Sequence, residues 1–142
     1  MKILLAIDGS KFSETAVQVV RSEFRTQGTE VIVLQVVEPE IYAAPPQMAQ
    51  GYAPELQDQL KQAKESVART AEILLEAGFK VDSRVGENEV RTEILNVAED
   101  CHADLIVLGS HGKKGLRKFL MGSVAESIAR HAHCSVQIVR SP

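Results

Sequence analysis

A glycine- and lysine-rich segment, GSHGKKGLRKFLMGS, runs from Gly109 to Ser123. It follows the apolar run DLIVL and precedes a segment, beginning at Val124, that has the apolar spacing of a helix. Glycines allow a bound molecule to approach the backbone closely, and successive peptide N–H groups in such a loop can bind an anion. The start of the following helix would add its unpaired N–H groups and its positive dipole end. The chemistry that this segment predicts is the binding of phosphate groups.

The segment matches neither of two common phosphate-binding patterns. The Gly112-Lys113 pair lacks both the earlier glycine and the following Ser or Thr that a P-loop requires. No two glycines in the chain stand two residues apart, so the dinucleotide-binding pattern GxGxxG is absent. The segment from Gly109 to Ser123 also contains the cations Lys113, Lys114, Arg117 and Lys118. They could neutralise phosphate charge, but such a group of charges is more typical of a solvated surface.

Three other polar residues have both a functional and a structural interpretation. Asp8 could bind the uncharged part of a phosphate-bearing ligand, or it could only stabilise the turn that follows its apolar run. Ser123 could contact phosphate, and with Glu126 it also fits a helix-capping box. His111 could contact phosphate or act as a base. Because no Ser/His/Asp or Cys/His set accompanies it, we predict no catalytic residue.

These residues must be positioned by an alternation of strands and helices. The apolar runs predict strands over Lys2–Asp8, Val31–Val37, Asp104–Gly109 and Val136–Val139, with a weaker, edge-like strand over Lys80–Val85. Helical periodicity predicts helices over Ser13–Arg25, Glu55–Ala77, Thr92–Cys101 and Val124–Ala132, with Gly28 and Gly78 as stops for the first two. The proline-rich segment Glu38–Pro54 predicts a long loop. Together they indicate a parallel sheet with helices on both faces.

In such a sheet, ligands bind beyond the carboxyl ends of the strands, where the strand order reverses. The order 2-1-3-4-5 and the order 3-2-1-4-5 are both compatible with five strands. In the second of these, the first and fourth strands flank the crevice. Asp8 and the segment from Gly109 would then face each other across one cleft.

Composition limits the possible functions. The 142 residues, 44% hydrophobic and 25% charged, are typical of one globular domain. The net charge of −3, with few aromatic residues, argues against a nucleic-acid partner, and no apolar run is long enough to cross a membrane. Cys101 and Cys134 make no disulfide framework, so we expect the reducing cytoplasm. His131 and His133 would point to different sides of a helix, so we predict no metal site.

The spaced pattern G-x2-G-x9-G-[ST], formed by Gly109, Gly112, Gly122 and Ser123 after the strand DLIVLGS, resembles the nucleotide-binding signature of the universal stress proteins, in their ATP-binding branch. The opening ILLAIDGS resembles the first strand of that family, VLQVVEP its second strand, and HAHCSVQIVR its C-terminus. The resemblance spans essentially the whole chain and is weakest over residues 39–53.

The resemblance implies one Rossmann-like domain over residues 1–142, of the adenine nucleotide alpha hydrolase type, with strand order 3-2-1-4-5. It also implies ATP in the cleft, with Mg²⁺ coordinated mainly by the phosphates. Asp8 would bind the adenine or ribose, and the backbone of Val36 would meet the adenine edge. Ala125 departs from the Ser or Thr of many relatives, which could weaken binding. The implied nucleotide-binding residues are Asp8, Val36, Gly109, Ser110, His111, Gly112, Gly122, Ser123 and Val124.

The function that follows is an ATP-binding regulator or sensor of the stress response, with slow or no hydrolysis. Fast phosphoryl transfer needs a positioned base and dedicated metal ligands, and only cations are evident. The alternatives are a slow ATPase or nucleotidyl-transfer enzyme, although the usual His-x-Gly-His is missing, and a nucleotide-free dimeric interaction module. Val136–Val139 would be an exposed apolar edge strand, so we predict a homodimer through it, with an unidentified downstream protein partner.

Overall fold

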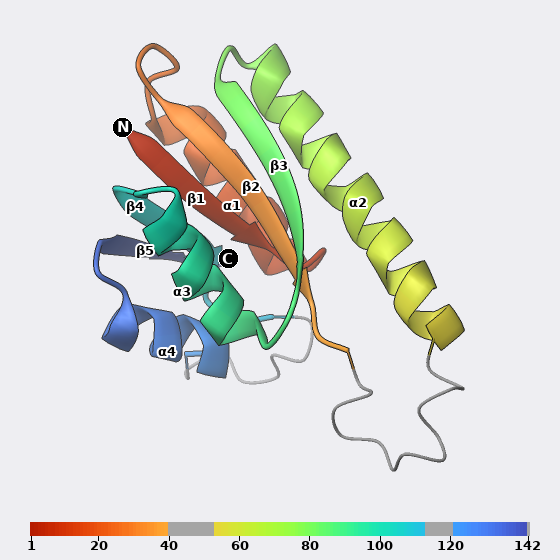
Figure 1. Ribbon diagram of the computed structural model, residues 1–142. Helices are drawn as coiled ribbons and strands as arrows, with labels where there is room; N and C mark the ends of the chain where they lie inside the picture. The colour runs from red at the N-terminus through yellow and green to blue at the C-terminus, as the bar shows by residue number, and fades with distance from the viewer. Residues whose placement is uncertain (40–52, 113–120, 142) are drawn as a thin grey trace.

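The computed structural model describes residues 1–39, 53–112 and 121–141 (Figure 1). Strands and helices alternate along these residues, and the strands form a single parallel sheet in the order β3-β2-β1-β4-β5. The predicted fold class and strand order are therefore confirmed. The elements are β1 (Lys2–Ile7), α1 (Lys11–Glu23), β2 (Glu30–Val37), α2 (Ala53–Glu76), β3 (Lys80–Glu87), α3 (Val90–Asp100), β4 (Leu105–Gly109), α4 (Ser123–His131) and β5 (Ser135–Val139).

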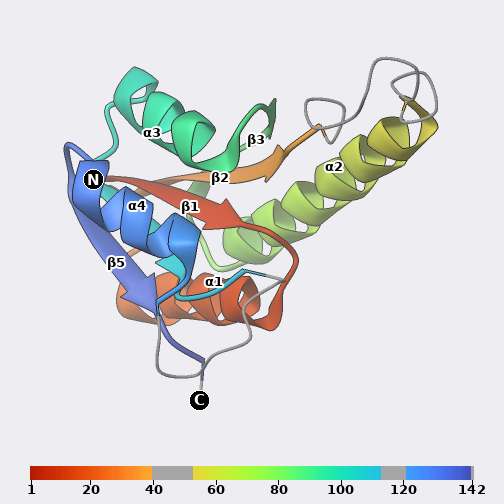
Figure 2. The ribbon, with the colours of Figure 1, turned by 90° about the horizontal axis from the view of Figure 1, so that it is seen from below.

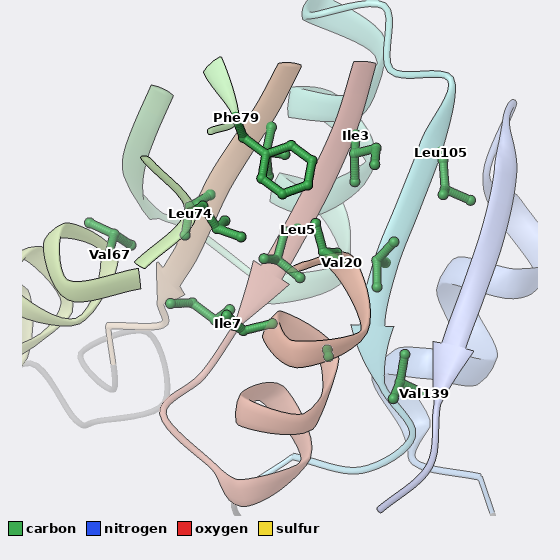
Figure 3. Close-up of a cluster of buried hydrophobic side chains, with 14 residues drawn as sticks. Ile3, Leu5, Ile7, Val20, Val67, Leu74, Phe79, Leu105 and Val139 are labelled. Carbon is green, nitrogen blue, oxygen red and sulfur yellow. The ribbon is translucent and has the colours of Figure 1, made fainter. Parts of the chain in front are cut away.

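Helices cover both faces of the sheet (Figure 2): α1 and α2 pack on one face, and α3 and α4 pack on the other. Side chains alternate along a strand, so Ile3, Leu5 and Ile7 of β1 enter the cluster under α1 and α2 (Figure 3). Leu4 and Ala6 enter the cluster under α3 and α4. This two-sided burial explains why the central strands are nearly continuous apolar runs.

The predicted end of the first helix and its predicted stop need correction. The first helix ends at Glu23 rather than Arg25, because Phe24 takes an extended conformation and packs against the core. Gly28 lies in the turn before β2, with φ of 77°, and is not the stop of that helix. Gly78, by contrast, lies two residues after Glu76, the last residue of α2, with φ of 104°, and its N–H donates to the Leu75 carbonyl at 3.0 Å.

The second helix begins at Ala53, so Pro54 belongs to it and not to the predicted loop. A proline is tolerated in a first helical turn, where its missing N–H would have had no intrahelical acceptor. Residues 40–52 of that loop lie outside the described residues. β3 extends to Glu87 because it pairs with β2 along its whole length, up to Val37. Among the described helices, none is both long and apolar enough to span a bilayer.

Candidate functional site

The strand order reverses between β1 and β4, which are neighbours in the sheet. After β1 the chain continues into α1 on one face, and α4, the helix that follows β4, packs on the other. A cleft of about 1250 Å³ opens at the carboxyl edge of the sheet, lined by the ends of β1, β2 and β4, the first turns of α3 and α4, and side chains of α2. Its volume exceeds the roughly 300–1000 Å³ typical of small-molecule sites. This is where the topology of the fold predicts a ligand.

All but one of the residues predicted from the sequence line this cleft: Asp8, Val36, Gly109, His111, Gly112, Gly122, Ser123 and Val124. The exception is Ser110, which is 4% exposed. Its N–H donates to the Val139 carbonyl at 2.8 Å, and its own carbonyl accepts from the Gly122 N–H at 2.7 Å. Ser110 therefore joins β4 to β5 and to the start of α4, and it has no surface on the cleft.

The start of α4 faces the cleft without a side-chain cap. The N-cap residue is Gly122 rather than Ser123, and among the described residues no side chain accepts a capping hydrogen bond from the first turn. The predicted capping box is wrong, because Glu126 instead accepts from Arg130 Nη2 at 2.9 Å. The Glu126 N–H donates to the Gly122 carbonyl, so the N–H groups of the residues between them precede the first intrahelical bond. The N–H groups of this helix end can donate hydrogen bonds to a bound anion.

The glycines of the signature make close backbone approaches within the protein. A Cβ added to Gly109 would lie 2.7 Å from the Phe12 Cβ atom, and one added to Gly122 would lie 2.8 Å from the Ser110 carbonyl oxygen. A Cβ on Gly112 would lie 2.9 Å from Asp8 Oδ2. Side chains at these positions would displace α1, the start of α4 or Asp8, so the glycines keep the cleft walls in place.

Asp8 stands at the end of β1, partly buried. Its Oδ1 atom accepts from the Ser10 N–H at 2.9 Å, which supports the turn into α1. Ser10 in turn caps α1 by accepting from the Ser13 N–H. The structural role considered for Asp8 is thus present, and the same carboxylate also lines the cleft beside Gly112.

Two buried polar atoms in residues that line the cleft have no hydrogen-bond partner within the described residues: His111 Nε2 and Gln35 Oε1. The His111 ring is held by a 3.0 Å hydrogen bond between Nδ1 and Ser110 Oγ, and it packs against the Phe12 ring with a centroid distance of 5.2 Å. Leaving a buried polar atom unpaired costs about 1–3 kcal/mol.

Sequence reasoning missed Arg91, which lines the cleft from the first turn of α3. Its Nη2 atom donates to Ser123 Oγ at 3.5 Å, and its Nη1 atom donates to Glu89 Oε1 at 3.1 Å. A signal was available, since a cation in the first turn of a helix opposes the helix dipole and needs a compensating negative group nearby. Gln35 was also missed, because a polar residue near the end of a buried strand gives no indication of what it faces.

Glu89 is the N-cap of α3 and accepts from the Thr92 N–H at 2.8 Å and from Thr92 Oγ1 at 2.9 Å. Partial burial works to raise the pKa of Glu89, but the hydrogen bonds from Thr92 and the charge of Arg91 outweigh it and hold that pKa below its ordinary value. Glu89 is therefore a carboxylate at neutral pH, able to pair with Arg91.

No group of three or more His, Cys, Asp or Glu side chains in the described part of the chain is placed to hold a metal ion. His131, considered above as a ligand, makes a 2.9 Å hydrogen bond between its Nδ1 atom and the Ser127 carbonyl in the last turn of α4.

The sheet order and the cleft at its reversal define a Rossmann-like α/β domain with a ligand-binding edge. The sequence matches the Universal stress protein family over residues 1–140, and the chain belongs to this family.

Relatives and solved structures agree with that assignment. Universal stress protein MJ0531 of Methanocaldococcus jannaschii is 33% identical over 142 residues, covering 99% of this chain and 82% of the relative. The solved structure of MJ0577 from the same organism has a TM-score of 0.87 at 31% identity, covering 99% of this chain and 96% of that one. A universal stress protein from Archaeoglobus fulgidus, solved in complex with dAMP, has a TM-score of 0.71 at 21% identity, covering 98% of this chain and 97% of that one.

Proposed function

We propose that this protein binds ATP in the cleft and acts as a nucleotide-dependent regulator or sensor of the stress response, with slow or no hydrolysis. The observation that carries the proposal is the uncapped start of α4, which faces the cleft across from Asp8. Its first-turn N–H groups and positive dipole end suit phosphate, and the carboxylate suits a neutral hydroxyl or amine. The dAMP complex of the A. fulgidus protein supports an adenine nucleotide as the ligand.

In this proposal, the phosphates lie at Gly122, Ser123 and Val124, and Asp8 binds the ribose or adenine. Val36, at the end of β2, meets the adenine edge through its backbone, and the backbone of Gly109 and Gly112 lies along the ribose and phosphates. His111 Nε2 gains the hydrogen-bond partner that it lacks among the described residues. Mg²⁺ would accompany ATP mainly through the phosphate oxygens.

Slow or absent hydrolysis follows from the groups around the cleft. Rapid phosphoryl transfer needs a base that orients water and protein ligands that fix the metal. His111 is the candidate base, and its Nδ1 atom is paired with a serine hydroxyl rather than with a carboxylate.

We expect the protein to work in the cytoplasm, where the thiols of Cys101 and Cys134 stay reduced.

The variant Gly122→Val with Ser123→Ala tests the proposal by calorimetric titration with ATP. The added Cβ would lie 2.8 Å from the Ser110 carbonyl oxygen, so the start of α4 must move and lose its fit to phosphate. We expect ATP binding to be lost, with the fold retained by circular dichroism. Ala129→Val, on the exposed side of the same helix, is the matched control and should bind as the wild type does.

Native mass spectrometry of the purified protein separates the alternatives. Bound ATP supports the proposed binder, and ADP with continued release of phosphate supports a slow ATPase. An empty cleft that stays empty when ATP is added would contradict the proposal and favour an interaction module.

A further inference from the structure

Arg91 reaches from one helix to the start of another across the cleft. α3 and α4 pack side by side on the same face of the sheet. The Arg91 side chain leaves the first turn of α3, and its Nη2 atom lies 3.5 Å from the Ser123 hydroxyl, the first residue of α4. The guanidinium therefore stands beside the helix end at which the proposed phosphates would lie.

A cation at this position faces the positive ends of two helix dipoles. The start of a helix carries the equivalent of about half a positive charge, and Arg91 lies near the starts of both α3 and α4. Both dipoles repel a cation. At α3 the carboxylates of Glu89 and of Glu38, which accepts from the Val90 N–H at 2.8 Å, offset this repulsion, whereas no described side chain caps α4. Glu89 is the one carboxylate paired with Arg91 among the described residues, and it also accepts the capping hydrogen bonds of α3.

The Glu89 pair alone does not explain the placement of Arg91. The two side chains are 45% and 41% exposed, and ion pairs at such exposure contribute about 0–1 kcal/mol. The pair also uses Nη1, which leaves Nη2 directed at a neutral hydroxyl at the limit of hydrogen-bond distance. A guanidinium is a planar fork that suits two oxygens of one phosphate.

We infer that Arg91 binds a phosphate group of the nucleotide together with Ser123 and so selects ligands by their phosphate charge. The inference rests on the proposed function and deepens it. Asp8 and the cleft walls hold the nucleoside, whereas Arg91 supplies a positive charge that adenosine cannot use. ATP is therefore favoured over adenosine, and AMP lies between the two.

Calorimetric titrations of the wild type with ATP, AMP and adenosine, repeated on Arg91→Ala, test this inference. A charge-assisted contact predicts that the alanine variant binds ATP about 10- to 100-fold more weakly while its adenosine affinity is unchanged. Arg91→Lys keeps the charge without the planar fork and should restore only part of the loss. Arg84→Ala is the matched control, because Arg84 is 44% exposed, pairs with Asp82 at 3.3 Å and does not line the cleft.

The outcomes separate this inference from the proposed function. If Arg91→Ala binds ATP as tightly as the wild type does, or loses the same affinity for ATP as for adenosine, the role of Arg91 is overturned and the proposed binding function stands. A wild-type protein that binds none of the three ligands would overturn both. Selective loss of ATP binding, with Arg84→Ala unaffected, would support the inference.

Discussion

Glu89 links the stability of α3 to the position of Arg91, and its removal has a calculable effect. Glu89→Ala deletes the acceptor of the Thr92 N–H and Thr92 Oγ1 hydrogen bonds at 2.8 and 2.9 Å. Loss of an N-cap side chain costs about 0.5–2 kcal/mol of the free energy of unfolding. The Arg91 pair adds little at its exposure, so we expect a loss of about 1 kcal/mol at pH 7.

The pH dependence of this loss follows from the lowered pKa of Glu89. A carboxyl group whose pKa is lower in the folded state stabilises the fold above its unfolded-state pKa, ordinarily 4.5, and loses that contribution as pH falls through the folded-state value. The stability difference between wild type and Glu89→Ala should therefore be full at pH 7 and should shrink as pH falls below the ordinary value. A protonated carboxyl still accepts a weaker hydrogen bond, so part of the difference remains.

Urea denaturation of both proteins between pH 7 and pH 3 measures this difference directly. Glu72→Ala, on an exposed position of α2, is the control for loss of one negative charge and should show little change at either pH. A difference between wild type and Glu89→Ala that is absent at pH 7, or that stays constant down to pH 3, would refute the reasoning about the cap and its pKa.

Two further predictions concern the packing and the edge of the sheet. Ile128→Ala removes a fully buried side chain that joins α4 to the sheet and should cost about 2–5 kcal/mol in denaturant unfolding, whereas Ile73→Ala, 39% exposed, should cost far less. β5 pairs with β4 and forms one edge of the sheet, so we predict a homodimer through Val136–Val139. Light scattering coupled to size exclusion should give twice the mass of the chain, and a monomer at micromolar concentration would contradict this.

The sheet could be predicted from the sequence because its central strands are buried on both faces. Short, continuous apolar runs such as Leu105–Gly109 are typical of strands that helices cover on both sides. The ends of elements were less predictable, since they depend on tertiary contacts. α1 ends at Glu23 because Phe24 packs into the core, and the sequence shows only that a glycine follows at Gly28.

The candidate site was predictable where its residues share one segment or one strand end. Ser123 and Glu126 have the spacing of a capping box, but the hydrogen bond from Gly122 to the Ser110 carbonyl sets where α4 begins. Arg91 could not be connected with Ser123 from the sequence, because their meeting depends on α3 and α4 lying side by side. Contacts between elements distant in the chain are what the sequence pattern leaves undetermined.

Ser110 shows how the sheet positions residues that line the cleft. Its N–H is bound to β5, its carbonyl holds the start of α4, and its hydroxyl orients the His111 ring. Each of these bonds lies within the protein, so Ser110 fixes where α4 begins and how the His111 ring is oriented. Because Ser110 is buried and does not line the cleft, it can act on a ligand only by positioning its neighbours.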